Sequence, residues 1–431
     1  MKIAFFTDCY LDLTGGITTA INAEKEELER RGHTVQIYSS AYPRSDREKQ
    51  ALAKKHIFPV PSCKIFGRGA TPIARRPRVI EKWLMKNHPE LQEFDIFYVH
   101  YEAGCSIAGL RLGSRLGIPT VQVMHGREDV GEAHIIPLGL RTFVAVMLDW
   151  FHSWYLPHPL KVRRDDYFAK TIASAKMWTL MVNHANYADL VITPSENFRN
   201  ILTHYGVARE IVSLHHGVPD ELTRTPVSPR KLSDNEKLRI VWHSRLSGEK
   251  RILPFLEALN LITEAKPFRA THSPYHLDVY GDGPDHPLAV TYAKLHRLDV
   301  AFHGNTDFKE IEQTIKEAHL DVLVSYNYDT FGMILIEAEA LGTPVMIVDP
   351  ALGEIVPTDG YILSAGPTPE QMAASIMQLI GCPSKVEEMS KIMIKNRHQV
   401  KISTSADRLE SVFRELIRSR WKTSAKSPKN L

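Results

Sequence analysis

The chain has few cysteines, and their spacing does not indicate a structural metal. Only four cysteines occur in its 431 residues, at positions 9, 63, 105 and 382, and no two of them form a C-x-x-C pair. Neither a disulfide framework nor a zinc site is therefore indicated, which fits a reducing compartment. No two aspartates are separated by a single residue, so the paired-aspartate pattern that holds Mn²⁺ or Mg²⁺ is missing as well.

Long apolar runs and a strong excess of charge are also missing. No apolar stretch reaches the ~18 residues that a membrane span needs, and the nearest candidate is interrupted by Arg141 and Asp149. The net charge of +3 is too small to suggest nucleic acid as a partner. Only four apolar residues follow Met1-Lys2 before polar ones, which predicts no secretory signal. We expect a cytoplasmic protein, or one bound peripherally to the inner face of the cell membrane.

Two glycine-rich nucleotide motifs do not occur either. Gly281 and Gly283 are followed by His286, so there is no G-x-G-x-x-G, and there is no G-x-x-x-x-G-K. A nicotinamide enzyme and a P-loop phosphotransferase are therefore disfavoured. With 43% apolar and 24% charged residues, the chain is an ordinary globular protein whose length predicts two domains.

Residues 320–350 predict the order strand, loop, helix, strand. Short apolar runs at 321–325 and 345–348 flank an apolar helix at 333–341. Two such strands joined by a helix form a parallel crossover within a layered α/β domain. Ligands bind at the carboxyl ends of these strands, which here means the loop 326–332.

Two carboxylates flank that loop. Asp329 lies in the loop, and Glu337 lies in the helix among apolar residues, where its burial requires a hydrogen-bond partner. The helix starts at Phe331 and Gly332, whose backbone N–H groups offer a place for phosphate. An ordinary crossover with a Glu on a wetter face is the alternative.

This pattern resembles the donor-site signature of the family 4 retaining glycosyltransferases. The signature is an acid, seven intervening positions and a Glu, with F-G after the first acid and A-x-G-x-P-V after the second. The family's first acid is usually Glu, whereas this chain has Asp329, one methylene shorter. The resemblance implies that Asp329 contacts the transferred sugar and that Glu337 holds the ribose hydroxyls. It places the diphosphate on the segment Thr330, Phe331, Gly332 and Met333.

The same half of the chain supplies two cations. A strand expected at 238–242 is followed by Arg245 and Lys250, at the place where a departing diphosphate needs positive charge. An Arg and a Lys at this spacing serve that purpose in the family, although its usual glycine before the Arg is here Ser244. Metal-dependent single-domain sugar transferases are disfavoured, because protein cations replace the metal. The resemblance implies no required cofactor, and a nucleotide diphosphate sugar as substrate, with a UDP-sugar favoured.

The first half opens with a strand at 3–6, the loop glycines Gly15 and Gly16, and a helix at 17–31. These glycines would let the backbone approach a phosphate or sugar, as the family's glycine loop does; a plain turn is the alternative. After a strand at 120–124, the order H-x-x-E-D resembles the diacylglycerol glucosyltransferases of this family. It implies that His125 contacts the donor sugar and that Glu128 and Asp129 lie near the acceptor. Arg127 has no role in this interpretation.

Residues 61–89 form a basic stretch with interleaved apolar residues. Such a stretch can bind an anionic membrane, each cation adding about 1 kcal/mol, and lipid-modifying family members carry a comparable basic helix. A solvated helix face is the alternative. The residues in question are Lys64, Arg68, Arg75, Arg76, Arg78, Lys82, Trp83 and Lys86. A basic tail is a second candidate contact, with Arg418, Arg420, Lys422, Lys426 and Lys429.

An aromatic-rich stretch at 138–156 is the least typical segment. Trp150, Trp154 and Trp178 in this region are half of the chain's tryptophans. The stretch allows three interpretations: core, a dimer contact, or a helix that receives an acyl chain.

The predicted fold is therefore α/β, the GT-B arrangement of two Rossmann-like domains facing a central cleft. We expect an acceptor-side domain at 1–219, with a C-terminal helix at 404–431 crossing back onto it, and a donor-binding domain at 220–403. The predicted reaction moves a hexose, glucose from UDP-glucose, onto a hydroxyl of a membrane lipid such as diacylglycerol. A cell-wall, exopolysaccharide or teichoic acid acceptor is the alternative, and a sugar-nucleotide 2-epimerase or a catalytically silent donor-binding protein remain further ones. The expected partners are the nucleotide sugar, a lipid or glycan acceptor, and an anionic membrane.

Overall fold

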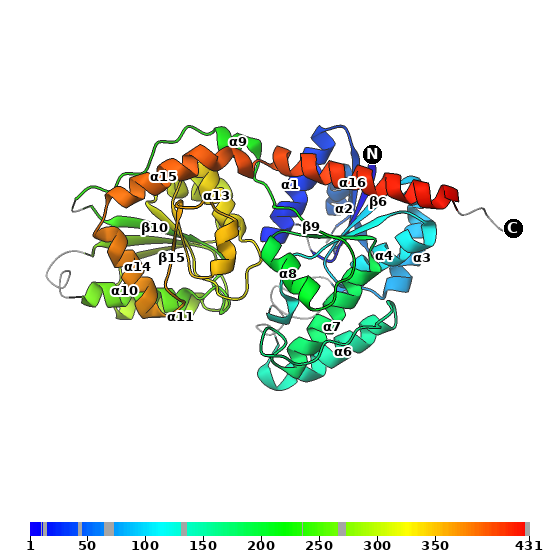
Figure 1. The fold of residues 1–431 in the computed structure, drawn as a ribbon, viewed down its shortest axis with the longest axis horizontal. Coiled ribbons are helices and arrows are strands. Elements are labelled where there is room, and N and C mark those ends of the chain that lie inside the picture. Colours follow the sequence, from blue (N-terminus) through cyan, green and yellow to red (C-terminus); the bar gives the residue numbers. More distant parts are fainter. Residues whose placement is uncertain are drawn as a thin grey trace. The chain divides into compact units, whose positions relative to one another are not determined.

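The structure is a computed structural model that describes residues 1–9, 11, 15–41, 45–63, 73–130, 136–234, 236–265 and 273–426. The chain divides into two compact units, Met1–His215 with Ser405–Leu431, and His216–Thr404. Each unit has helices packed on its own parallel sheet (Figure 1).

The first unit contains a seven-stranded sheet in the order β3-β2-β1-β6-β7-β8-β9, with neighbouring strands parallel. In β1, Phe6 packs on one face with Phe97, while Phe5 packs on the other with Ile21. This alternation explains why the strand is apolar at successive positions, since both faces are covered. The strands are β1 (Lys2–Thr7), β2 (Thr34–Ser40), β3 (Ile57–Val60), β6 (Ile96–His100), β7 (Thr120–Val123), β8 (Leu190–Thr193) and β9 (Ile211–Ser213).

Helices cover both faces of this sheet, and a short antiparallel pair, β4 (Ser62–Cys63) and β5 (Ile73–Ala74), stands apart from it. Helix α4 ends at Gly117, whose φ of 73° lies in the left-handed region that glycine adopts at a helix end. The helices are α1 (Gly16–Arg30), α2 (Asp46–Lys54), α3 (Pro77–Asn87), α4 (Gly104–Leu116), α6 (Arg141–Ser153), α7 (Ile172–Tyr187) and α8 (Glu196–His204).

The second unit contains a six-stranded parallel sheet in the order β12-β11-β10-β13-β14-β15. The order reverses between β10 and β13, the point at which α/β sheets bind ligands. The strands are β10 (Leu238–His243), β11 (Tyr275–Tyr280), β12 (Val300–Gly304), β13 (Leu320–Leu323), β14 (Val345–Ile347) and β15 (Tyr361–Leu363). The helices are α9 (Asp220–Arg224), α10 (Ile252–Glu264), α11 (His286–Leu295), α12 (Phe308–Glu317), α13 (Met333–Leu341), α14 (Pro369–Ile380) and α15 (Ser384–Asn396).

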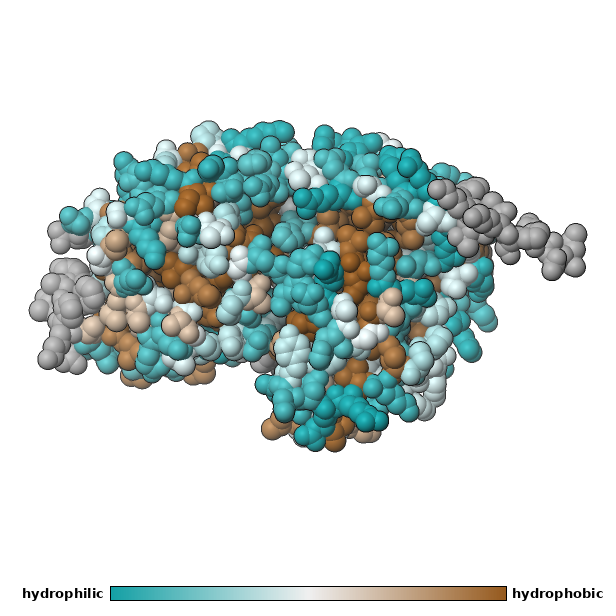
Figure 2. All heavy atoms as spheres, viewed as in Figure 1, coloured by the Kyte–Doolittle hydropathy of each residue, from teal (hydrophilic) through white to brown (hydrophobic). Residues whose placement is uncertain are grey.

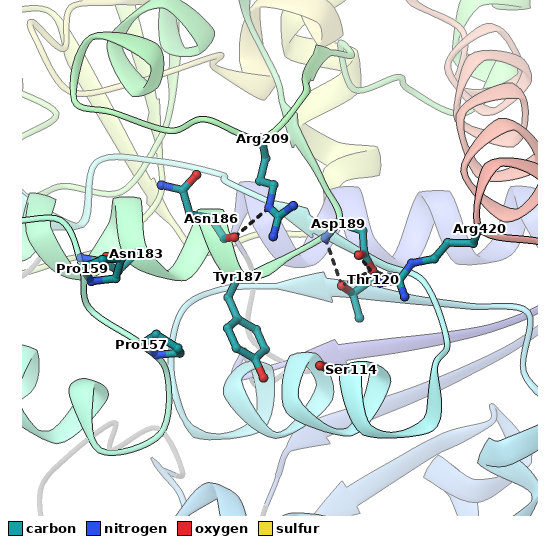
Figure 3. A pocket seen from close by; sticks show the side chains of 10 residues that line it. All are labelled: Ser114, Thr120, Pro157, Pro159, Asn183, Asn186, Tyr187, Asp189, Arg209 and Arg420. Carbon is teal, nitrogen blue, oxygen red and sulfur yellow. Dashed lines mark hydrogen bonds and ion pairs between the residues drawn. The ribbon is translucent and has the colours of Figure 1, made fainter. Parts of the chain in front are cut away.

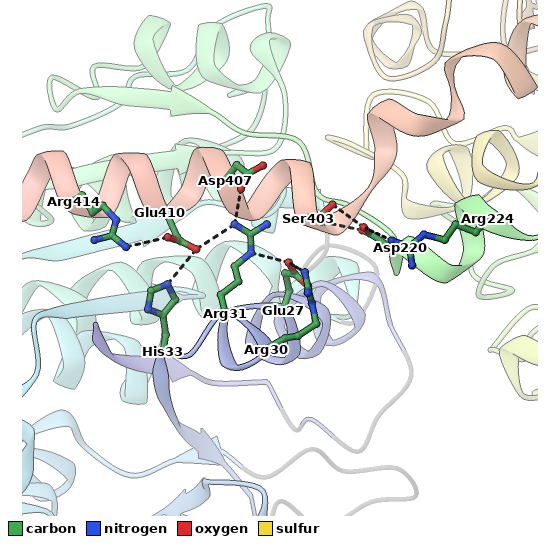
Figure 4. Close-up of polar contacts among 10 residues, drawn as sticks. All are labelled: Glu27, Arg30, Arg31, His33, Asp220, Arg224, Ser403, Asp407, Glu410 and Arg414. Carbon is green, nitrogen blue, oxygen red and sulfur yellow. Dashed lines mark hydrogen bonds and ion pairs between the residues drawn. The ribbon is translucent and has the colours of Figure 1, made fainter.

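Helix α16 (Ile402–Lys426) begins in the second unit and belongs to the first from Ser405 onward. In the first unit, Phe413 is fully buried against Tyr98, with ring centroids 5.1 Å apart. Arg31, which follows the last residue of α1, pairs with Asp407 at 2.6 Å and Glu410 at 3.2 Å (Figure 4). The predicted return of the C-terminal helix to the first domain is therefore confirmed.

The basic tail is only partly described. Arg420 forms an ion pair with Asp189, whereas Lys429 and the side chains of Lys422 and Lys426 lie outside the described residues. Among the described helices, none combines the length and the apolarity that a membrane span requires.

Candidate active site

The two residues of the F-G pair, Phe331 and Gly332, fix the conformation of the loop before α13. Phe331 is buried, and its ring meets His216 edge-on with centroids 5.3 Å apart. Gly332 has a φ of 81°, and a Cβ at this position would lie 2.6 Å from Leu323. Glycine is favoured at such a site, because the backbone is left-handed and an added Cβ would require the Leu323 side chain to shift. The amide groups at the start of α13 are thereby fixed.

Lys250 and Asp329, both predicted site residues, lie together beside this loop. The Lys250 ammonium is 2.7 and 2.9 Å from the two Asp329 carboxylate oxygens, and the Ser325 hydroxyl also donates to Asp329. The Tyr328 ring centroid lies 5.3 Å from the Lys250 nitrogen. The pair places a positive and a negative group where the resemblance puts the diphosphate and the sugar.

Arg245 is the second predicted cation, and its side chain is 60% exposed. One guanidinium nitrogen lies 3.0 Å from Glu249, a buried carboxylate that also accepts a hydrogen bond from Ser247. Burial favours the neutral acid, but Ser247 and Arg245 outweigh it, so the pKa of Glu249 is lowered. The buried carboxylate therefore holds one end of Arg245 while most of the guanidinium faces solvent.

The glycines of the G-D-G-P segment support the loop that carries Arg245. A Cβ on Gly281 would lie 2.3 Å from the Ser244 carbonyl, and one on Gly283 would lie 2.2 Å from the Leu246 carbonyl. The Leu246 N–H donates to the Asp282 carbonyl at 3.1 Å. In the sequence, these glycines are notable only because they do not complete a dinucleotide-binding motif. Two glycines directly after a strand were the available signal.

Glu337 faces a histidine that the sequence analysis missed. His243, at the end of β10, lies 3.5 Å from Glu337 through Nδ1 and 2.7 Å from Asp321 of β13 through Nε2. Burial favours a neutral imidazole, but Asp321 and Glu337 outweigh it, so the pKa of His243 is raised. Burial also raises the pKa of both carboxyls, and His243 opposes this. The sequence signal for this cluster is that His243 and Asp321 are polar residues within two otherwise apolar strands.

In the first unit, His125 follows β7 and contacts His100 at the end of the neighbouring strand β6. His125 Nε2 lies 2.9 Å from His100 Nδ1, and the rings stack with centroids 5.2 Å apart. The sequence analysis did not single out His100. The role of His125 in contacting a donor sugar stays a prediction.

Glu128 and Asp129 have different surroundings. Glu128 accepts a hydrogen bond from the Tyr101 hydroxyl at 3.3 Å. Asp129 is buried and accepts two hydrogen bonds from Arg127, at 2.8 and 3.2 Å. Arg127 also lies 3.9 Å over the Phe168 ring. Arg127 thus balances the charge of Asp129, and an acceptor role for either acid stays a prediction.

Gly15 lies just before α1, and its carbonyl accepts a hydrogen bond from the Thr18 hydroxyl at 2.8 Å. The nearest atom to a Cβ on Gly15 would be 3.8 Å away, so packing within the first unit does not require a glycine there. Gly16 is the first residue of α1. Residues 10 and 12–14 lie outside the described part of this loop, and contact of both glycines with a ligand stays a prediction.

Helix α3 carries three of the predicted membrane cations, Arg78, Lys82 and Lys86, but its apolar side is already buried. Ile80 and Leu84 are fully buried in the first unit's core, and Trp83 is half-buried beside His88. Lys64 and Arg68 lie outside the described residues. The exposed cations of this segment are Arg75, Arg76, Arg78, Lys82 and Lys86. Helix α3 therefore offers charge with little apolar surface.

Two of the pockets lined by described residues belong to the first unit. One, of about 330 Å³, includes Thr120 and Asp189 at the amino ends of β7 and β8 (Figure 3), away from the edge at which such sheets bind ligands. The other, of about 340 Å³, lies between α6, α7 and the segment after β7, beside Arg127 and Asp129. Its apolar lining consists of Val130, Ile136, Leu138, Ala145, Leu148, Phe168, Ala173 and Met177.

Comparison with known proteins identifies the class. The chain matches the Glycosyltransferase Family 4 model over residues 14–222 and the Glycosyl transferases group 1 model over residues 224–399. The protein therefore belongs to the family 4 glycosyltransferases, as its motifs predicted, and is a nucleotide-sugar-dependent glycosyltransferase.

Individual relatives agree with this assignment. The chain is 25% identical over 358 residues to alpha-monoglucosyldiacylglycerol synthase of Streptococcus pneumoniae, covering 80% of this chain and 70% of that protein. HepE of Anabaena in complex with UDP is 16% identical with a TM-score of 0.65, covering 96% of this chain and 100% of that one. The G117R mutant of S. aureus TarM is 14% identical with a TM-score of 0.65, covering 99% of this chain and 100% of that one. These two structures confirm the predicted two-domain GT-B fold class.

Proposed function

We propose that this enzyme transfers a hexose, with retention, from a UDP-sugar such as UDP-glucose to a hydroxyl of a membrane lipid such as diacylglycerol. The observation that carries the donor half is the meeting of Lys250 and Asp329 beside the start of α13. The pneumococcal relative named as a monoglucosyldiacylglycerol synthase and the UDP complex of HepE support the lipid and the nucleotide.

In the proposed reaction, the bond between the anomeric carbon and the phosphate oxygen breaks, and the nucleoside diphosphate departs. The acceptor oxygen bonds to the same face of that carbon, and its proton passes to the departing phosphate. Arg245, Lys250 and the amides of residues 330–333 would stabilise the growing negative charge. Glu337 would accept the ribose hydroxyls, while Asp329 would position the sugar. The resemblance adds His125 as a sugar contact.

The acceptor half rests on the pocket beside Asp129. Its apolar lining suits an acyl chain, and the polar groups in the same lining suit a hydroxyl-bearing head. Arg141 and Lys170 add two cations to the lining of the same pocket. Glu128, next in sequence to Asp129, is the second acid that we assign to the acceptor side.

The test is transfer from labelled UDP-glucose to diacylglycerol in vesicles, with labelled lipid and released UDP measured together. We expect glucolipid and UDP in equal amounts, and no UDP release above slow hydrolysis when the lipid is omitted. A 2-epimerase would convert the donor without acceptor. A silent donor-binding protein would show a higher Tm with UDP-glucose but release no UDP. Either result would overturn the proposal.

A further inference from the structure

Helix α6 of the first unit exposes an apolar face. Phe143, Met147, Trp150 and Trp154 recur at intervals of four, three and four residues, which places them on one side of a helix. Phe143 is 67% exposed and Trp150 is 56% exposed. Leu138, immediately before the helix, is 79% exposed. Apolar residues are visible at the lower rim of the first unit in Figure 2, where Figure 1 places α6.

The opposite side of α6 is turned into the protein and carries polar groups beside the apolar Ala145 and Leu148. Asp149 and His152 are buried, and they reach α7 through Lys176 at 2.9 Å and His184 at 3.0 Å. A helix on a water-soluble surface normally has the reverse arrangement, with its apolar stripe inward. Specific polar contacts thus hold α6 in an orientation that keeps its aromatic residues outside.

Positive charge borders this apolar face. Arg141 and Lys170 line the same pocket as Leu138, and Arg164 donates to the Lys170 carbonyl at 3.2 Å. Residues 136–180 carry six Lys or Arg side chains against three acids. Asp149 is paired with Lys176, and Asp165 accepts the N–H groups of residues 167 and 169. The Leu138 end of the face therefore carries cationic side chains, and the stretch of chain around it has a net positive charge.

We propose that this face of α6, defined by Leu138, Phe143, Met147, Trp150 and Trp154, docks the enzyme on an anionic lipid bilayer. Tryptophan, phenylalanine and leucine partition into the boundary between headgroups and acyl chains, while the bordering cations contact lipid phosphates. A neutral partner surface would leave those cations without a counter-charge. The apolar side of α3 is buried. This helix therefore contributes only the long-range electrostatic attraction of its cations to the anionic bilayer. The inference rests on the proposed function, because docking on a bilayer would bring the lipid acceptor to the pocket beside Leu138.

The test is sedimentation of the full-length protein with vesicles of phosphatidylglycerol and phosphatidylcholine, compared with phosphatidylcholine alone. We expect binding to the anionic vesicles and a loss of about ten-fold or more in partitioning for W150Q/W154Q. The control is Leu295→Gln on α11 of the second unit, where an apolar residue that is more exposed (75%) than either tryptophan lies outside the proposed face. Its partitioning should equal that of the wild type, and all variants should keep the wild-type Tm.

Two outcomes would overturn the proposal. One is unchanged partitioning of W150Q/W154Q when R78Q/K82Q on α3 no longer binds, which would assign the membrane contact to charge on α3 alone. The other is a wild-type dimer that W150Q/W154Q converts to a monomer with no vesicle binding by either, which would assign the face to a second copy of the chain. The sedimentation assay contains no nucleotide sugar. Its result therefore does not depend on whether the enzyme transfers glucose to lipid, and the two proposals can fail independently.

Discussion

The Nε2 atom of His243 lies 2.7 Å from a carboxylate oxygen of Asp321. Because an ionised carboxylate only accepts hydrogen bonds, Nε2 carries a proton, and Nδ1 is turned towards Glu337 at 3.5 Å. Asp321 is fully buried in β13, and Glu337 lies on α13. The imidazole thus connects the sheet to the carboxylate that we assign to the ribose, and it is a positioning residue for that carboxylate.

Replacing His243 with glutamine should raise the KM for the donor about ten-fold, with a smaller change in kcat, because an interaction made equally in ground and transition states is weakened. The control is His398→Gln, which changes an exposed histidine of the same unit. Steady-state kinetics with UDP-glucose measure both constants. An equal fall in kcat and kcat/KM would instead place His243 in the chemical step.

The pH dependence of the same variant has a definite sign. The pKa of His243 is raised above its ordinary value of 6.5, so the imidazolium stabilises the folded unit fully below pH 6.5. That contribution is lost as the pH rises through the raised pKa. Donor affinity should weaken over the same range, since Glu337 loses its facing positive charge. In H243Q the donor KM should no longer depend on pH in this window, and a persisting dependence would assign the titration elsewhere.

Lys250 is expected to act on the departing diphosphate. Lys250→Met should lower kcat about 100-fold, the scale of losing one charge-stabilising group. Lys391→Met, which removes an exposed lysine from α15 of the same unit, should leave kcat unchanged. Turnover of the two variants with UDP-glucose and lipid vesicles provides the comparison. Equal turnover in both would contradict the assignment of Lys250.

Much of the second unit's architecture could be predicted from the apolar patterns. The helix expected at 333–341 is α13, and the strand expected at 238–242 is β10. These elements follow from local periodicity and helix-ending residues. The contact between His243 and Asp321 could not be predicted, because it joins positions 78 apart in the sequence through the pairing of β10 with β13.

Helix α6 shows a different limit. Core was one of three interpretations of residues 138–156, and this one is wrong for the exposed side, where Trp150 and Trp154 lie. The apolar residues of a helix normally face inward, so the pattern alone suggests burial. The orientation is reversed because partners on α7, Lys176 and His184, hold the polar side. Those partners are not visible in the local sequence.

Gly332 offers a test of the loop before α13. Gly332→Ala should lower the free energy of unfolding by about 2–4 kcal/mol, because a left-handed residue gains a Cβ and that Cβ meets Leu323. The control is Gly304→Ala, which has a similar φ of 70° but no atom within 4 Å of the added Cβ. It should cost only the backbone strain, about 1–2 kcal/mol. Urea unfolding gives both values, and equal losses would show that Leu323 moves aside.

Three histidines form a chain in the first unit that ends at two acceptors. His158 contacts Asp149 at 3.1 Å and also His152, which contacts His184 at 3.0 Å. His184 lies 3.0 Å from the Gln122 side-chain oxygen, while the Gln122 amide nitrogen donates to two carbonyls. These contacts connect three imidazoles to one another and to two acceptors, the Asp149 carboxylate and the Gln122 side-chain oxygen.

This arrangement predicts that acid weakens the first unit. Burial lowers the pKa of His152 well below 6.5 and that of His184 to about 3. In the unfolded chain both imidazoles bind protons below pH 6.5, whereas in the folded unit they stay neutral. Their contribution to stability is therefore complete above pH 6.5 and falls with the pH by up to about 1.4 kcal/mol per pH unit for each histidine. Urea unfolding between pH 7 and pH 5 measures the slope of the free energy of unfolding against pH. In His184→Gln this slope should decrease by the contribution of one histidine, whereas the control His204→Gln, at an exposed site, should keep the wild-type slope. A wild-type slope in H184Q would mean that His184 is protonated in the folded unit, which would contradict this prediction.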